Sequence, residues 1–206
     1  HHLNSPLMMN PSLAMTLTLA VLLVANLLTK LWLSGRQVRH VAQHRDQVPA
    51  AFAHTISLDA HQKAADYTMA KARVGVADMG LDALTLVAWT LLGGLDLLNQ
   101  VTLDWLGEGM GQQIMLVVSF SLIGGLIGLP LSLFQTFGIE QRFGFNNTTP
   151  KLWVSDMLKG LLVGMVLGLP ILWLVLWLMQ AGGTLWWLYT WAALVAYQLF
   201  VMWIAP

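Results

Sequence analysis

The chain has 206 residues, of which 57% are hydrophobic and only 10% are charged, and ten of them are Trp. Soluble domains average about 25% charged residues, so this composition excludes an ordinary soluble globular protein and predicts an integral membrane protein. The formal net charge is zero, which argues against nucleic acid as a partner. The chain has no Cys, which excludes disulfide bonds and thiolate metal ligands without fixing the cellular compartment.

Residues 1–10 form a short polar N-terminal tail. Its two leading His residues are consistent with the remnant of a purification tag. The first membrane span is predicted over residues 13–33, because it carries no charge before Lys30 and matches the roughly 20 apolar residues that cross a bilayer. No basic residue precedes this span and no clear small-residue cleavage site follows it, so we expect a retained anchor rather than a signal peptide.

A long polar section follows, from residue 34 to residue 82. Ser57 has the residue type of a helix N-cap, so a helix is predicted from Leu58 onward, running without a turn signal into the second span at residues 81–98. Asp96 lies near the far end of that span. An ionisable group deep in a bilayer is costly and often functional, so Asp96 is either an interfacial carboxylate or one that faces a polar cavity.

The second half of the chain is dominated by apolar runs. The predicted elements are a short loop (99–113), a third span (114–137), a short interfacial helix (151–159), a fourth span (160–179), a tight turn (180–183) and a fifth span (184–206). The fold class is therefore all-α. We expect an integral membrane helical bundle of about five transmembrane helices, with a long cytosolic helical extension before the second.

Glycines recur at a spacing of four residues in two of these spans. Gly160, Gly164 and Gly168 share one face of the predicted fourth span, and Gly124 and Gly128 do the same in the third. Small residues at this spacing allow two helices to approach closely in lipid. The interpretation as helix packing competes with a second one, in which these residues line a cavity.

Basic residues predict the orientation of the chain. All ten Lys and Arg flank the first and third connections between spans, seven at the first and three at the third. A chain with five spans places these two connections and the C-terminus on one side, which the positive-inside rule makes the cytoplasm. We expect a multi-pass protein of the bacterial inner membrane, with the N-terminus outside and residues 34–80, residues 138–159 and the C-terminus in the cytoplasm.

One polar, motif-like stretch interrupts the apolar second half, at residues 139–150. Gly144 supplies unusual backbone angles and Asn146 bonds backbone groups, which predicts a structured turn. The closing Pro indicates that a new element begins there. Glu140 and Arg142 are predicted to form a structural ion pair that fixes the loop, although a catalytic acid and a transition-state clamp use the same residue types.

The same stretch carries a resemblance to a known family. Ile139-Glu140-Gln141-Arg142-Phe143-Gly144-Phe145-Asn146 resembles the IEE(K/R)HGFN signature of the type I CAAX prenyl proteases, with Gln141 in place of an acid and Phe143 in place of His. We call residues 139–150 the signature loop. Upstream, His61-Gln62-Lys63-Ala64-Ala65-Asp66-Tyr67 resembles the QKA..Y helix of that family. The resemblance covers roughly residues 36–206.

The resemblance implies a zinc metalloendopeptidase of the membrane, of which residues 11–206 are the N-terminal membrane domain. That domain would anchor the enzyme and wall a chamber that admits peptide or membrane-protein substrates. Relatives carry HExxH and a distal Glu ligand beyond the point that matches Pro206. We therefore expect the catalytic zinc domain to be absent from this chain. We expect the chain itself to bind no zinc and to be inactive alone. Its expected partners are the lipid bilayer and the missing catalytic domain, on which the signature loop docks.

A zinc peptidase needs two His one helical turn apart and a Glu that activates water. His40 and His44 have this spacing, but Val41 replaces the Glu and no third ligand is evident. We interpret them as surface histidines, with a self-contained zinc enzyme as the alternative. A further alternative is a non-enzymatic scaffold or transporter-like module, although the sequence shows no convincing internal repeat.

Overall fold

The structure is a computed structural model that describes residues 11–52 and 54–204. The predicted tail at residues 1–10 and the last two residues of the predicted fifth span lie outside this part. Its regular elements, in order, are α1 (Pro11–Gln43), η1 (Ala50–Phe52), α2 (Leu58–Thr90), α3 (Gly94–Leu106), α4 (Met110–Leu133), η2 (Phe134–Glu140), α5 (Pro150–Ala181), η3 (Gly183–Leu185) and α6 (Trp186–Ile204). Since every one of these elements is helical, the all-α prediction is confirmed.

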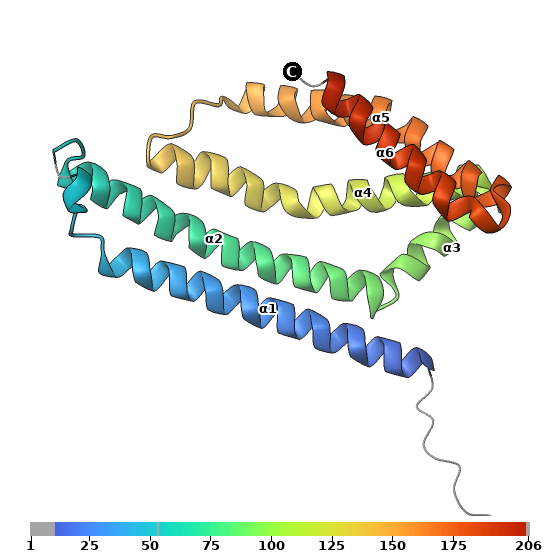
Figure 1. Cartoon of the computed structure of the whole chain (residues 1–206), viewed down its shortest axis with the longest axis horizontal. Helices are drawn as coiled ribbons and strands as arrows, with labels where there is room; N and C mark the ends of the chain where they lie inside the picture. The colour runs from blue at the N-terminus through green and yellow to red at the C-terminus, as the bar shows by residue number, and fades with distance from the viewer. Residues whose placement is uncertain (1–10, 53, 205–206) are drawn as a thin grey trace, which may run out of the picture. The chain divides into compact units, whose positions relative to one another are not determined.

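Contacts between the helices divide the chain into two compact units. One unit consists of the chain up to Gly94 together with Leu126–Asn147, and the other consists of Leu95–Gly125 and the chain from Thr148 onward. In the first unit, α1 and α2 run side by side and η2 packs on α2 (Figure 1). In the second unit, α5 and α6 lie side by side (Figure 1). The helix α4 contributes its first part to the second unit and its last part to the first.

The helices match the dimensions and the chemistry of a bilayer. Four stretches are long and apolar enough to cross a membrane, and the bent pair of α2 and α3 makes a fifth if it is counted as one span. Within the described chain, the buried hydrophobic side chains are Ala65 and Val74, while many Leu, Met and Trp side chains are exposed. Exposed apolar side chains on helices suit contact with lipid tails. The ends of the membrane-spanning parts stay predictions.

The second span is not the continuous helix predicted over residues 81–98. The helix α2 ends at Thr90 and α3 begins at Gly94. Gly93 has a φ of 77°, which glycine adopts far more readily than other residues. A Cβ on Gly94 would lie 2.7 Å from the carbonyl oxygen of Ala88. The adjacent glycines therefore permit the break inside an otherwise apolar run.

Residues 99–113, predicted as a short loop, are mostly helical and belong to α3 and α4. Three of their polar side chains are hydrogen-bonded to one another. The Gln112 side-chain amide donates to Asn99 Oδ1 at 2.8 Å and to Thr102 Oγ1 at 3.0 Å, and both Thr102 and Gln112 are buried. Such hydrogen bonds hold helices together in apolar surroundings, so polarity here indicates a joint between α3 and α4.

The interfacial helix predicted at residues 151–159 and the fourth span form one continuous helix, α5. The Thr149 hydroxyl caps its first turn by accepting a hydrogen bond from the Leu152 amide at 3.2 Å. Pro150 occupies the first turn, where its missing N–H costs nothing. The new element predicted at Pro150 is thereby confirmed, as is the predicted Ser57 cap of α2, which accepts from the Ala60 amide at 3.2 Å.

Gly160, Gly164 and Gly168 line an open cavity instead of a tight helix contact. A Cβ added at any of the three would meet no atom within 4 Å. A cavity of about 380 Å³ lies between them and α4, which contributes Val118 and Ser121 to its lining. Within the described chain, this face of α5 makes no close helix contact and lines a hollow against α4.

We predict that Gly164→Ala does not lower the stability of the chain. The added methyl group enters open space, and the higher helix propensity of Ala stabilises the helix by up to about 1 kcal/mol. Thermal unfolding in detergent measures the change. The control is Gly182→Ala, whose Cβ would lie 2.5 Å from the carbonyl oxygen of Leu178, so its Tm should fall. Equal losses in both variants would contradict the open cavity.

Candidate functional site

The signature loop is entered through a π-helix. The segment η2 follows α4 directly and has π-helical hydrogen bonding up to Glu140. Pro130, inside α4, cannot donate a hydrogen bond to the preceding turn. A Cβ on Gly138 would lie 3.2 Å from the Phe134 ring, so the absence of a side chain gives that ring room. Such wide turns are rare and occur frequently at functional sites.

Gly144 ends this helix in the way predicted for it. Its φ is 73°, in the left-handed region where glycine has no steric cost. Its amide donates to the Gln141 carbonyl at 3.1 Å, and the Phe145 amide donates to the Glu140 carbonyl at 2.8 Å. This pair of bonds is the Schellman motif, which satisfies the last carbonyls of a helix. The motif turns the chain sharply and places Phe143 and Phe145 on either side of the glycine.

Both phenylalanines contact α2. The Tyr67 ring lies 5.6 Å from the Phe143 ring in an edge-on arrangement and 4.8 Å from the Phe145 ring, measured between centroids. Lys63 Nζ lies 5.5 Å from the centroid of the Phe145 ring. Lys63 and Tyr67 are four residues apart, so they share one face of α2. The two motifs that carry the family resemblance therefore pack against each other.

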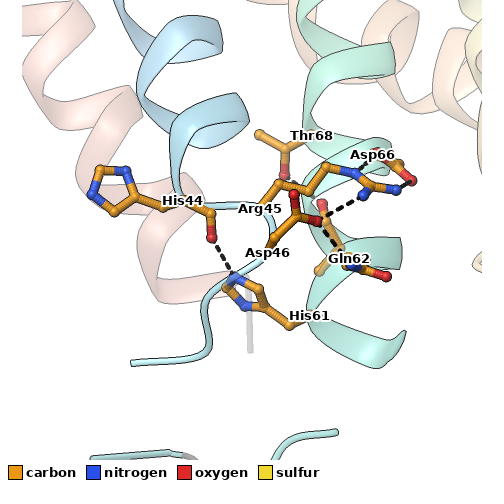
Figure 2. Close-up of polar contacts among 8 residues, drawn as sticks. His44, Arg45, Asp46, His61, Gln62, Asp66 and Thr68 are labelled. Carbon is orange, nitrogen blue, oxygen red and sulfur yellow. Dashed lines mark hydrogen bonds and ion pairs between the residues drawn. The ribbon is translucent and has the colours of Figure 1, made fainter. Parts of the chain in front are cut away.

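A second face of the same helical segment holds the end of α1 (Figure 2). Arg45 donates two parallel hydrogen bonds to Asp66, from Nε to Oδ1 at 2.7 Å and from Nη2 to Oδ2 at 2.8 Å. The Gln62 amide donates to Asp46 Oδ1 at 2.8 Å, and His61 Nε2 donates to the His44 carbonyl at 2.9 Å. Bidentate Arg–carboxylate pairs fix geometry as well as charge.

The paired charges shift each other's titration. The hydrogen bonds from Arg45 hold the pKa of the Asp66 carboxyl below its usual value, against a smaller opposing effect of desolvation. The hydrogen bond to Asp66 likewise raises the pKa of Arg45. Both groups lie outside the predicted spans, in the polar section of the chain. Both partners are therefore ionised throughout the neutral range.

The segment His61–Tyr67 thus has two functions in the structure. Gln62 and Asp66 face the end of α1, while Lys63 and Tyr67 face the signature loop. The sequence analysis identified the segment but not its partners. The sequence does hold a signal for two partners. Gln62 and Asp66 are four residues apart, as are Lys63 and Tyr67, and residues at this spacing share one face of a helix.

The predicted ion pair between Glu140 and Arg142 is absent from the described chain, whose ion pairs join other residues. The reason is geometric. Both residues lie at the end of a helix and are two positions apart, a spacing that points side chains to different faces. Glu140 contributes instead through its backbone, since its carbonyl accepts from the amides of Phe145 and Asn146. Arg142 is exposed.

Asp96 lies in the first turn of α3. Its side chain is exposed. A carboxylate in the first turn of a helix interacts favourably with the helix dipole, which gives Asp96 a structural explanation. Its placement at the interface or at a polar cavity stays a prediction.

The His40 and His44 pair does not fit a zinc site. Their ring centroids are 4.3 Å apart, and His44 Nδ1 donates a hydrogen bond to the His40 carbonyl at 2.8 Å. Among the described residues, no three His, Cys, Asp or Glu side chains form a group that could hold a metal ion. Without a third ligand or a Glu beside the pair, these residues supply neither the coordination nor the base of a zinc peptidase.

Comparison with known proteins decides the family. A family model described as the CAAX prenyl protease N-terminal domain, with five membrane helices, matches residues 37–206. The chain belongs to the CAAX prenyl protease family. It matches the N-terminal membrane domain of these zinc metallopeptidases, and it is an integral, multi-pass membrane protein. The resemblance inferred from the two sequence motifs is thereby confirmed.

Individual relatives agree with this assignment. A CAAX prenyl protease 1 homolog of Mus musculus is 26% identical over 187 residues, covering 85% of this chain and 39% of the relative. A probable CAAX prenyl protease 1 of Schizosaccharomyces pombe is 27% identical over 192 residues, covering 85% and 40%. The chain thus spans about two fifths of the length of these relatives.

The crystal structure of S. mikatae Ste24p has the same fold over most of this chain. The TM-score is 0.83 at 24% sequence identity, with 92% of this chain and 45% of that chain covered. This likeness supports the helical arrangement and no more, since the identity is low.

We predict that Tyr67 and Phe145 are energetically coupled. In a double-mutant cycle with Tyr67→Leu and Phe145→Leu, the two losses of unfolding free energy should fall short of additivity by about 0.5–1.5 kcal/mol, the value of an aromatic pair. Denaturation in detergent measures all four proteins. Tyr67→Leu combined with Leu17→Ala, in the same unit near the start of α1, is the control, for which the losses should add. Additive losses in the first cycle would show that the loop does not pack on α2.

We predict that Asp66→Asn destabilises the protein near pH 7 and that the difference from wild type becomes smaller in acid. A carboxyl whose pKa is lowered on folding contributes stability above its unfolded pKa of about 3.9 and loses it as the pH falls through the folded pKa. Thermal unfolding between neutral pH and about pH 3 measures this change. The control is Asp104→Asn, because Asp104 makes no ion pair within the described chain. A difference that persists unchanged at the lowest pH would exclude the Arg45–Asp66 pair as its cause.

Proposed function

We propose that this chain is the membrane domain of a zinc metalloendopeptidase, which it anchors in the bilayer and for which it walls a chamber that admits substrates. The observation that carries the proposal is the contact between the signature loop and the His61–Tyr67 segment in a chain of this family. Among the described residues, no group of His, Cys, Asp and Glu could hold a metal ion. In this proposal, hydrolysis therefore uses residues beyond them. The names of the relatives suggest prenylated proteins as the substrate class.

In this proposal the signature loop is a docking surface for the catalytic domain. Its backbone is fixed by the Schellman turn, and its aromatic side chains are held by α2. Arg142, left exposed and unpaired with Glu140, is available to a partner surface. A rigid loop with an exposed cation can bind a second domain without a large loss of conformational entropy.

The proposed orientation puts residues 34–80, residues 138–159 and the C-terminus in the cytoplasm. The contacts of Lys63 and Tyr67 with the signature loop support this arrangement, because they bring the first and third connections to the same end of the first unit. These are the two connections that carry the Lys and Arg residues. The bacterial inner membrane stays a prediction, since the relatives reported above are eukaryotic.

The coding sequence beyond Pro206 tests the proposal directly. An in-frame HExxH motif followed by a downstream Glu is expected, because these residues form a peptidase zinc site. A stop codon directly after Pro206 would contradict a peptidase made from a single chain.

We predict that Arg142→Ala in the complete protein lowers cleavage of a prenylated peptide at least ten-fold while leaving Tm unchanged. The reason is that docking is lost while the Schellman turn, which uses only backbone groups, remains. The assay measures kcat/KM with zinc present. The matched control is Lys151→Ala, a second exposed cation close in the chain, which should keep its activity. Unchanged cleavage by the Arg142 variant would remove Arg142 from the docking surface.

A further inference from the structure

Two adjoining hollows beside α1 are lined by basic side chains. The first, of about 410 Å³, lies between α1 and α2, and Lys30 and Lys71 contribute its charges. The second, of about 660 Å³, lies along α1 and is lined by Arg36, Arg39 and His40. Leu33 and Gln37 line both of them, so the two are neighbours on α1. No Asp or Glu lines either hollow, and the combined surface therefore attracts an anion.

The hollow between α1 and α2 offers donors as well as charge. Its lining includes Ser34 and Tyr67, whose side chains carry hydroxyl groups, and Gln37, whose side chain carries an amide. Neither Lys30 nor Lys71 forms an ion pair within the described chain. Lys71 Nζ instead lies 5.8 Å from the centroid of the Tyr67 ring. Ammonium and hydroxyl donors without a competing carboxylate suit the oxygens of a phosphate ester.

The rest of the lining is apolar except for Thr68, whose hydroxyl donates to the Ala64 carbonyl. Leu33 comes from α1, and Ala72, Gly75 and Met79 come from α2. A Cβ on Gly75 would meet no atom within 4 Å, so the glycine leaves the floor of the hollow open. A free phosphate ion would leave this apolar surface in water, whereas the glycerol and the first carbons of an acyl chain would cover it.

The hollow also lies beside the end of the first span predicted from the sequence, where we expect the protein to leave the bilayer. The uncharged run of α1 ends at Lys30. Trp32 is 58% exposed, and the Arg36 guanidinium lies 5.7 Å from the centroid of its ring. Exposed Trp side chains concentrate at membrane–water interfaces, where their rings sit at the level of lipid headgroups. A headgroup therefore lies at the depth of Lys30 and Lys71.

We propose that the hollow between α1 and α2 binds the phosphate headgroup of an anionic phospholipid, with Lys30 and Lys71 as its cationic ligands. Anionic lipid headgroups bind in hollows that lie between membrane helices and are lined by basic side chains, on the side of the membrane where Lys and Arg are concentrated. This site requires only that the chain spans a membrane. It does not depend on the proposed peptidase, so lipid binding and peptide cleavage are separate measurements.

The test uses the complete protein in nanodiscs or detergent, titrated with phosphatidylglycerol and followed by native mass spectrometry. The Lys30→Gln and Lys71→Gln double variant should bind phosphatidylglycerol about ten-fold more weakly or worse, with no change for zwitterionic phosphatidylcholine. The double variant with Arg at both positions keeps the charge and should keep binding. The control is Lys151→Gln with Lys159→Gln, which removes the same charge elsewhere. Equal losses in both Gln double variants would overturn the site in favour of general surface attraction.

A second variant tests the hollow without removing charge. Gly75→Leu places a side chain in the open floor and should weaken phosphatidylglycerol binding to a similar extent. Gly80→Leu, on the same helix and with equally open surroundings, does not line the hollow and should bind as wild type does. Unchanged binding by the Gly75 variant would overturn the proposed location.

Soluble competitors separate a lipid from a free anion. Inorganic phosphate or glycerol phosphate in large excess should leave the bound phosphatidylglycerol in place, because neither covers the apolar floor. Displacement by either would overturn the lipid assignment and make the hollow a phosphate site.

Discussion

The arrangement of the first unit depends on one helical segment, His61–Tyr67, which binds a different partner on each of two faces. Asp66 holds Arg45 at the end of α1, and Tyr67 holds Phe143 and Phe145. Because these contacts belong to one rigid helix, α2 cannot rotate without breaking both sets. The connection after α1 and the signature loop therefore contact the same short segment, although Arg45 and Phe143 are 98 residues apart in the chain.

The surrounding bilayer explains why so few polar contacts decide the structure. Lipid tails are as apolar as Leu, so the hydrophobic effect does not drive helices together in the membrane. The described chain accordingly has very few buried apolar side chains. Buried Gln112 and Thr102 join α3 to α4, and Gln180 donates to Gln113 at 3.3 Å to join α5 to α4. Each helix satisfies its own backbone, and sparse side-chain hydrogen bonds join some of the helices.

The sequence predicted features that depend on local chemistry and missed those that depend on partners. The apolar runs predicted the helices. Ser57, Gly144 and Pro150 predicted where helices begin or end, because caps and turns depend on residues only a few positions away. The presence of a glycine did not predict its structural role. Gly93 lies at a break between two helices, whereas Gly164 lies inside a helix and faces open space. Spacing cannot distinguish these outcomes, because the distinction depends on which atoms lie opposite. The pairing of the two family motifs was missed for the same reason.

The Lys and Arg residues of the first unit do more than set the predicted orientation of the chain. Arg45 is paired with a carboxylate and Lys63 lies against an aromatic ring, while Lys30 and Lys71 face a hollow that contains no carboxylate. A rule that counts charges treats these residues as equivalent. Their surroundings differ, so neutralising each one should have a different consequence. Loss of the charge of Arg45 removes the ion pair with Asp66, and loss of that of Lys63 removes a contact with the signature loop. Loss of the charges of Lys30 and Lys71 removes the cations of the proposed lipid site. The residues that carry the predicted topology signal therefore also line the proposed lipid site, and a substitution that keeps the charge count can still change that site.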